Sequence, residues 1–189
     1  MIEHGEVTRL LRDVRQGDGA AFERILAIMY DDLRTVARKQ LRREYQSPTL
    51  EPTALVHEAY LKMVGGTHVD AEDRAHLLAL AARAMRQVLV DRARRRAAEK
   101  RGGEDGWMNV TLTDGAGPTD GLAADELVAL DDALAQLEPR QRQIVECRFF
   151  GGMEDREIAA ALGVTDRTVR REWVKARARL NHALYGGAK

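Results

Sequence analysis

The sequence predicts an all-α protein, with two small helical domains joined by a flexible acidic linker and a helix-turn-helix in the second domain. Apolar residues recur at three- and four-residue spacing along most of the 189 residues. No segment shows the alternation of period two that marks a strand. A stretch between the two helical regions holds six glycines. We therefore expect domains at 1–101 and 122–189, with the linker at 102–121.

Four helices are expected in the first domain. Apolar stripes of helical period run over 7–14, 22–41, 53–63 and about 72–100. Gly17 and Gly19 separate the first two stripes, and Pro52 or Thr53 opens the third. The fourth stripe thins to alanine beyond Asp91 while arginines continue. We expect that end of the helix to project past the core.

Helical spacing resumes after the linker, over 127–137. Pro139 suits the first turn of a further helix, which would bury Ile144, Val145 and Phe149 and end at Gly151. Two shorter helical patterns follow, over 155–162 and 165–180. The second domain is therefore also predicted to be helical throughout.

The net charge is zero, but the charges are segregated along the chain. Residues 83–103 carry +6, residues 104–138 carry −9 without one Lys or Arg, and residues 139–189 carry +5. Two basic regions around an acidic one indicate two anion-binding surfaces. The charged N-terminus is no secretory signal, and no apolar run suits a membrane span. With Cys147 as its one cysteine, the chain is expected to be cytoplasmic, without a disulfide, metal or cofactor.

The residues from 155 to 174 have the pattern of a helix-turn-helix. Gly163 occupies the turn, where a positive φ is favourable for glycine, and Thr165 can cap the following helix. Six basic residues against two acidic ones lie between 165 and 180. Such a helix can enter the major groove, with cations meeting phosphates. The predicted DNA-contacting residues are Thr165, Arg167, Thr168, Arg170, Arg171 and Lys175.

Several motifs occur together in a recognisable order: GDGAAFER at 17–24, ALVHEAYLK at 54–62, VDRARRR at 90–96, LAQLEPRQR at 134–142, and then the helix-turn-helix. In this order and spacing the chain resembles the extracytoplasmic-function (ECF) subfamily of sigma-70-type RNA polymerase sigma factors. The resemblance covers about residues 7–101 and 125–184. It implies a non-enzymatic subunit that binds core polymerase and directs initiation at promoters.

The resemblance also implies roles for particular residues. The third helix would bind the clamp helices of the polymerase β′ subunit, through Glu51, Leu55, Val56, His57, Glu58 and Tyr60. Residues 65–76 correspond to the loop that holds a flipped base of the −10 element. The residues implied at the −10 region are Arg74, His76, Arg83, Arg86, Arg92, Arg94, Arg95 and Arg96. The second domain would read the −35 element and bind the β flap.

One departure from the family pattern lies at the start of the third helix. Many members have two more carboxylates where this chain has Thr53 and Ala54, so the acidic face for the clamp is weaker. A phosphate on Thr53 would restore about −1.5 to −2 charges near a helix N-terminus. We hypothesise that a Ser/Thr kinase activates the protein at Thr53. The alternative is that Thr53 only caps the helix beside Pro52.

Two other functions remain open from the sequence. A stand-alone helix-turn-helix regulator explains the second domain but leaves residues 51–62 without a role. A sigma-like chain could instead bind a protein partner, such as an anti-sigma factor, and no DNA. Promoter binding only with core polymerase favours the sigma factor, whereas tight binding by a free dimer favours the regulator. Absence of salt-sensitive DNA binding favours the protein-binding chain.

Overall fold

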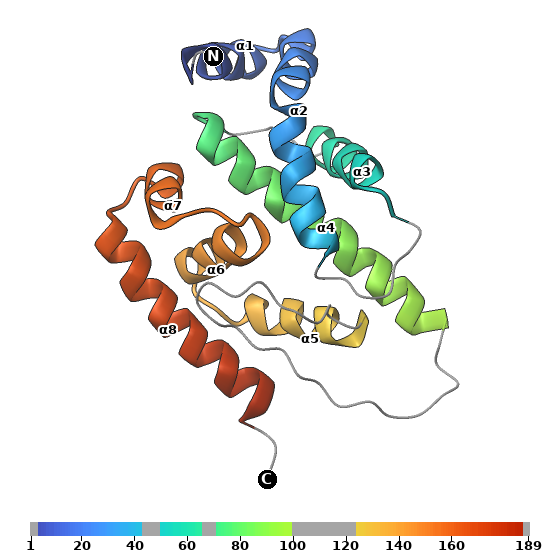
Figure 1. The fold of residues 1–189 in the computed structure, drawn as a ribbon, viewed down its shortest axis with the longest axis vertical. Coiled ribbons are helices and arrows are strands. Elements are labelled where there is room, and N and C mark those ends of the chain that lie inside the picture. The colour runs from blue at the N-terminus through green and yellow to red at the C-terminus, as the bar shows by residue number, and fades with distance from the viewer. Residues whose placement is uncertain (1–3, 43–49, 66–70, 100–123, 187–189) are drawn as a thin grey trace.

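The computed structural model describes residues 4–42, 50–65, 71–99 and 124–186. These residues form helices and the turns between them, so the predicted all-α class is confirmed. The first part of the chain holds α1 (His4–Arg15), α2 (Gly19–Leu41), α3 (Pro52–Val64) and α4 (Arg74–Glu99), as Figure 1 shows. The second part holds α5 (Ala124–Ala135), α6 (Pro139–Val145), the π-helical segment η1 (Glu146–Phe150), α7 (Asp155–Leu162) and α8 (Asp166–Tyr185).

The first four helices form a bundle around α2 and α4. Asp18 caps α2 by accepting hydrogen bonds from the backbone N–H groups of Ala20 and Ala21, which would otherwise lack partners. Met29 of α2 and Met85 of α4 are almost fully buried in this core. Gln40 adds a buried polar contact, since its Nε2 donates to the carbonyl of Ala82 at 3.0 Å.

The helix that begins at Pro139 does not continue as a regular α-helix. It changes at Glu146 into the π-helical η1, which carries the buried Phe149 and Phe150. The segment ends at Gly151, which keeps a helical φ of −78°, and the next residue, Gly152, has a positive φ of 62°. A Cβ at position 151 would lie 2.5 Å from the Cys147 carbonyl oxygen, so a side chain there would force the backbone apart. The predicted end at Gly151 is therefore explained by close approach.

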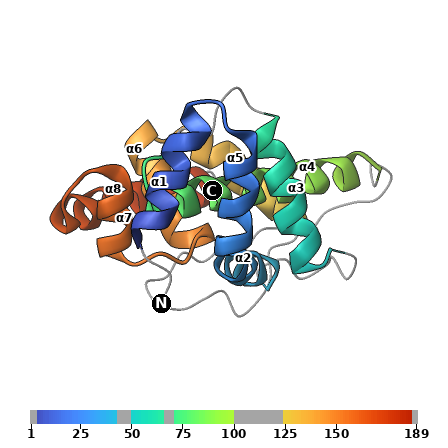
Figure 2. The same cartoon turned by 90° about the horizontal axis from the view of Figure 1, so that it is seen from above.

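Helix α4 lies between the two parts of the chain. It packs against α2 and α3 on one side and against α5, η1 and α7 on the other, and Figure 1 shows it crossing between them. Seen from above in Figure 2, α8 lies at one end of the molecule and the C-terminal end of α4 at the other. Val90 and Ala93 are buried. One side of the turn after Asp91 therefore still packs in the core through Ala93, whereas Arg94 and Arg95 are exposed, as expected for an end that leaves the core.

The predicted linker at 102–121 lies outside the described residues, and the domain boundaries stay a prediction. Within the described ranges, no helix combines the length and the apolar character that a membrane crossing requires. The same residues hold no group of three or more His, Cys, Asp or Glu side chains placed to bind a metal ion.

Candidate nucleic-acid interface

Helices α7 and α8 are joined by a short turn whose geometry matches the sequence pattern. Gly163 has a φ of 60°, in the left-handed region predicted for it. The backbone N–H of Val164 donates to the carbonyl of Ala159 and closes the end of α7. Thr165 caps α8, with its hydroxyl accepting from the N–H of Thr168 at 3.2 Å. Both local predictions, the glycine turn and the threonine cap, are confirmed.

The inner face of α8 is apolar and packs against α6 and α7. Val169, Trp173, Ala176 and Leu180 are all buried, at the spacing read from the sequence. The guanidinium of Arg148 lies 4.8 Å from the centre of the Trp173 ring, a cation–π contact that holds η1 against α8. The apolar face therefore fixes the orientation of α8 and determines which side chains face outward.

The outward face of α8 is cationic. The side chains of Arg170, Arg171 and Lys175 are 67%, 64% and 54% exposed, and Arg167 is exposed as well. Thr165 is exposed and Thr168 half-buried at the N-terminus of the helix. The structure thus brings all six residues predicted to contact DNA onto the first three turns of one helix. Their contact with DNA stays a prediction.

Glu172 lies beside Arg171 and Lys175 of the cationic face, and no role was predicted for it from the sequence. Its carboxylate accepts a hydrogen bond from Gln141 of α6 at 3.0 Å, and bonds from Arg171 and Lys175 at 3.1 Å each. The bond from Gln141 and that from Lys175 lower the pKa of Glu172 to about 2. Glu172 therefore stays ionised and positions two of the cations. The spacing of three residues between Glu172 and Lys175 was a signal for this pair.

The arginines of α4 are mostly held by carboxylates, which the sequence did not indicate. Arg74 pairs with Asp32 at 2.6 Å, Arg94 lies 3.1 Å from Asp131 and from Asp132, and Arg92 pairs with Glu58. His76 and Arg95 bond within their own segment, to the N–H of Glu72 and the carbonyl of Asp91. The side chain of Arg96 lies outside the described residues.

Arg86 departs most from its expected place. As a contact to the DNA backbone it was expected at the surface, but its side chain is 0% exposed. The guanidinium pairs with Asp131 of α5 and donates to Glu146 of η1 at 2.6 Å. In this arrangement α5 and η1 cover Arg86 and keep DNA from it. Arg83 keeps 44% of its side chain exposed and lies 3.8 Å from Glu146.

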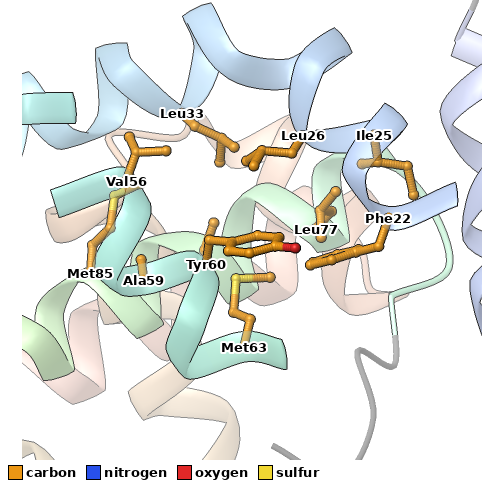
Figure 3. Close-up of a pocket in the computed structure, with 11 residues that line it drawn as sticks. Phe22, Ile25, Leu26, Leu33, Val56, Ala59, Tyr60, Met63, Leu77 and Met85 are labelled. Atoms are coloured by element: carbon orange, nitrogen blue, oxygen red, sulfur yellow. The ribbon is translucent and has the colours of Figure 1, made fainter. Parts of the chain in front are cut away.

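The face of α3 expected to bind the polymerase clamp is only partly at the surface. Leu55 and Val56 are buried in the core between α2 and α4, which corrects their expected place on the partner-facing side. Glu51 and His57 are exposed, and Glu58 is half-buried. Tyr60 stacks on Phe22 with ring centres 5.5 Å apart. Figure 3 shows the two rings beside a small apolar hollow that Met63 also lines.

Thr53 lies in the first turn of α3 with its side chain exposed. The cap of this helix is Glu51, and Pro52 occupies the first helical position. The interpretation of Thr53 as the capping residue is therefore wrong. Its hydroxyl oxygen instead accepts a hydrogen bond from the Tyr30 hydroxyl of α2 at 3.2 Å.

Comparison with known proteins agrees with the sequence motifs. A family model described as ECF sigma factor matches residues 4–186, so the chain belongs to the ECF sigma factors. These are transcription initiation factors and not enzymes. No curated protein gives a significant match.

Two solved structures are similar to the chain. One is CnrH in complex with the cytosolic domain of CnrY, at 19% identity and a TM-score of 0.41, with 97% of this chain and 99% of that chain covered. The other is the sigma factor RpoE in complex with the anti-sigma factor NepR from Bartonella quintana. It shares 18% identity at a TM-score of 0.37, with 89% of this chain and 98% of that chain covered.

Proposed function

We propose that this ECF sigma factor binds core RNA polymerase and directs initiation at promoters with distinct −10 and −35 elements. In this proposal the part with α1–α4 binds the β′ clamp and the −10 element. The part with α5–α8 reads the −35 element and binds the β flap. The observation that carries the proposal is α8, a helix with a fully packed apolar face and an exposed cationic face directly after a tight turn.

The outer face of α8 suits the major groove for two reasons. Thr165 and Arg167 lie at the N-terminal end, where side chains of a recognition helix reach base edges. Arg170, Arg171 and Lys175 follow over the next turns, where cations meet phosphates on both sides of the groove. Glu172 restrains Arg171 and Lys175, so less side-chain entropy is lost when they bind.

For the polymerase clamp, the proposed surface is the exposed side of α3. It combines Glu51 and His57 with Leu61 and Val64, whose exposures are 62% and 51%. Exposed aliphatic side chains and a carboxylate on the same helix suit a partner surface that offers both apolar groups and arginines. This surface is supported from the core side of α3 by Leu55, Val56 and Tyr60.

We also propose that phosphorylation of Thr53 strengthens clamp binding. A Ser/Thr kinase would transfer the γ-phosphoryl group of ATP to Oγ1, releasing ADP and the hydroxyl proton. The exposed hydroxyl is accessible to a kinase, and the site lies in the first turn of α3, where the helix dipole favours an anion. The phosphate would add about −1.5 to −2 charges beside Glu51.

The test is the affinity of the full chain for core polymerase, measured for the unmodified protein, Thr53→Glu and Thr53→Ala. Binding by Thr53→Glu alone supports the sigma factor and the switch. Equal binding by all three supports a constitutive sigma factor, under control of its expression or of an anti-sigma factor, and contradicts the switch. Binding by none contradicts the proposed function and favours the stand-alone regulator.

A further inference from the structure

The arginine face of α4 is covered by carboxylates from the second part of the chain. Asp131 of α5 pairs with Arg86 and lies 3.1 Å from Arg94, and Glu146 of η1 accepts from Arg86 at 2.6 Å. Arg83 lies 3.8 Å from the same Glu146. Three of the arginines proposed for the −10 region thus lie within 4 Å of two carboxylates that are distant in sequence, and Glu146 is shared with Arg142.

The ion pairs of Arg86 with Glu146 and Asp131 are buried, so they depend on the two parts of the chain staying packed together. The side chain of Arg86 is 0% exposed, that of Glu146 is 3% exposed, and that of Asp131 is 17% exposed. Buried ion pairs of this kind are little screened by salt, and loss of either carboxylate leaves the buried guanidinium with only one of its two partners. The Nε of Arg86 is also buried without a hydrogen-bond partner, so the site does not satisfy the whole guanidinium group. Separation of the two parts of the chain would return Arg86 and its two carboxylate partners to water.

The carboxylates occupy the positions where phosphate groups would meet these arginines. An Asp or Glu carboxylate and a phosphate group can each offer two oxygens to the two N–H groups of a guanidinium. The cations of α8 also lie near carboxylates, Glu172 and Asp155, but none of them is buried as Arg86 is, since Arg170 keeps 67% and Lys175 keeps 54% of its side chain exposed. The two proposed DNA-binding surfaces therefore differ in accessibility within one conformation.

We propose that Asp131 and Glu146 form an intramolecular clasp on Arg86 that keeps the −10 surface of α4 closed to DNA while the α8 surface stays open. This inference rests on the proposed function, because it takes α4 to be a DNA-binding helix. The closed protein can engage DNA through α8 only. Opening needs a competitor for the clasp, either promoter phosphates at α4 or a polymerase surface that draws the two parts of the chain apart.

The experiment compares Asp131→Asn with Asp125→Asn in the full chain. Both substitutions remove one carboxylate from α5, but Asp125 is an exposed residue at the start of the helix, about two turns before the clasp. Spin labels on Glu23→Cys and Asn181→Cys, both exposed, report the distance between α2 and α8. The buried Cys147 is expected to stay unlabelled. A mixed-sequence single-stranded DNA of about 20 nucleotides probes the affinity of α4 for phosphates.

For Asp131→Asn we expect a longer and broader distance distribution and about tenfold tighter DNA binding than for Asp125→Asn, as the open fraction rises. Equal distances in the two variants would overturn the clasp. A longer distance without tighter binding would show that the clasp masks no DNA site, which contradicts both this inference and the proposed role of α4. If Asp131→Asn shows the longer distance and the tighter DNA binding but the protein does not bind core polymerase, the clasp is supported and only the proposed sigma function is overturned.

A second variant covers the possibility that Asp131→Asn destabilises the fold. Asp132→Asn removes only the exposed contact of Arg94, since the Asp132 side chain is 65% exposed. We expect a smaller shift of the spin-label distance in the same direction, with unchanged helicity by circular dichroism. No shift in a folded Asp132→Asn protein, together with an unfolded Asp131→Asn protein, would count against the clasp.

Discussion

The side chains of Gln141 and Glu172 form a buried hydrogen bond of 3.0 Å that joins α6 to α8. Both polar atoms of the Gln141 amide are hydrogen-bonded, because its nitrogen donates to Glu172 and its oxygen accepts a bond from Arg179 at 2.8 Å. Arg179 also donates to Glu138 at 2.8 Å, at the N-terminal cap position of α6. The proposed recognition helix is therefore attached to the helix behind it by a polar network as well as by its apolar face.

Glu172→Gln is expected to lower the stability of the protein at neutral pH. The pKa of Glu172 in the folded protein is about 2, below its ordinary value of 4.5, so the ionised group stabilises the fold above pH 4.5. This stabilisation falls progressively as the pH drops from 4.5 to 2. We expect a loss of about 2 kcal/mol at pH 7. Denaturant unfolding measured from pH 7 to pH 2.5 checks this.

The control for Glu172→Gln is Glu23→Gln, an exposed position on α2. The gap in stability between the wild-type protein and Glu172→Gln should narrow as the pH falls, whereas Glu23→Gln should follow the wild-type protein throughout. A gap that is constant over the whole pH range would show that the carboxylate charge is not the cause.

Cys147 should react slowly with thiol reagents in the folded protein. Burial, and next the carboxylate of Glu146, raise the pKa of Cys147 to about 12, so thiolate is scarce up to that pH. We expect labelling by Ellman's reagent at pH 8 to be at least about 100-fold slower than in the denatured chain. Fast labelling of the folded protein would contradict the buried position of η1.

Arg170→Ala should weaken −35 recognition and leave the fold intact. Its side chain is 67% exposed and lies 3.9 Å from Asp155, so little stability depends on it. Loss of one such DNA contact is expected to reduce promoter-dependent transcription about tenfold. Arg140→Ala is the matched control, because Arg140 is an exposed arginine on α6 outside the proposed interface. Equal loss in both variants would indicate a general effect of charge.

Two glycines should respond differently to alanine. At Gly163 a Cβ meets nothing within 4 Å, so only the φ of 60° is unfavourable, and we expect a loss of about 1 kcal/mol. At Gly151 the Cβ would lie 2.5 Å from the Cys147 carbonyl oxygen, and the backbone must move. Thermal unfolding should therefore show a larger loss for Gly151→Ala than for Gly163→Ala. The reverse order would contradict the geometry of η1.

Local features were accessible from the sequence because they depend on neighbouring residues. The helical periods, the turn at Gly163, the cap at Thr165 and the buried face of α8 involve residues within a few positions of one another. The π-helical form of η1 was not foreseen, because the extra residue in its turn leaves no periodic signal over five positions. Leu55 and Val56 belong to the apolar stripe expected over 53–63, but the resemblance placed them at the clamp, because the motif marks the helix and not which of its sides the bundle covers.

The sequence by itself determined the all-α class, the order of the helices, the packed inner face of α8 and the family. It also showed that charge is segregated along the chain. Only the tertiary structure decided which charges meet, because Arg86 and its partners Asp131 and Glu146 are 45 and 60 positions apart. Packing of α5 and η1 on α4 turned an expected surface arginine into a buried ion pair, since burial depends on the neighbouring helices and not on the helix that carries the residue.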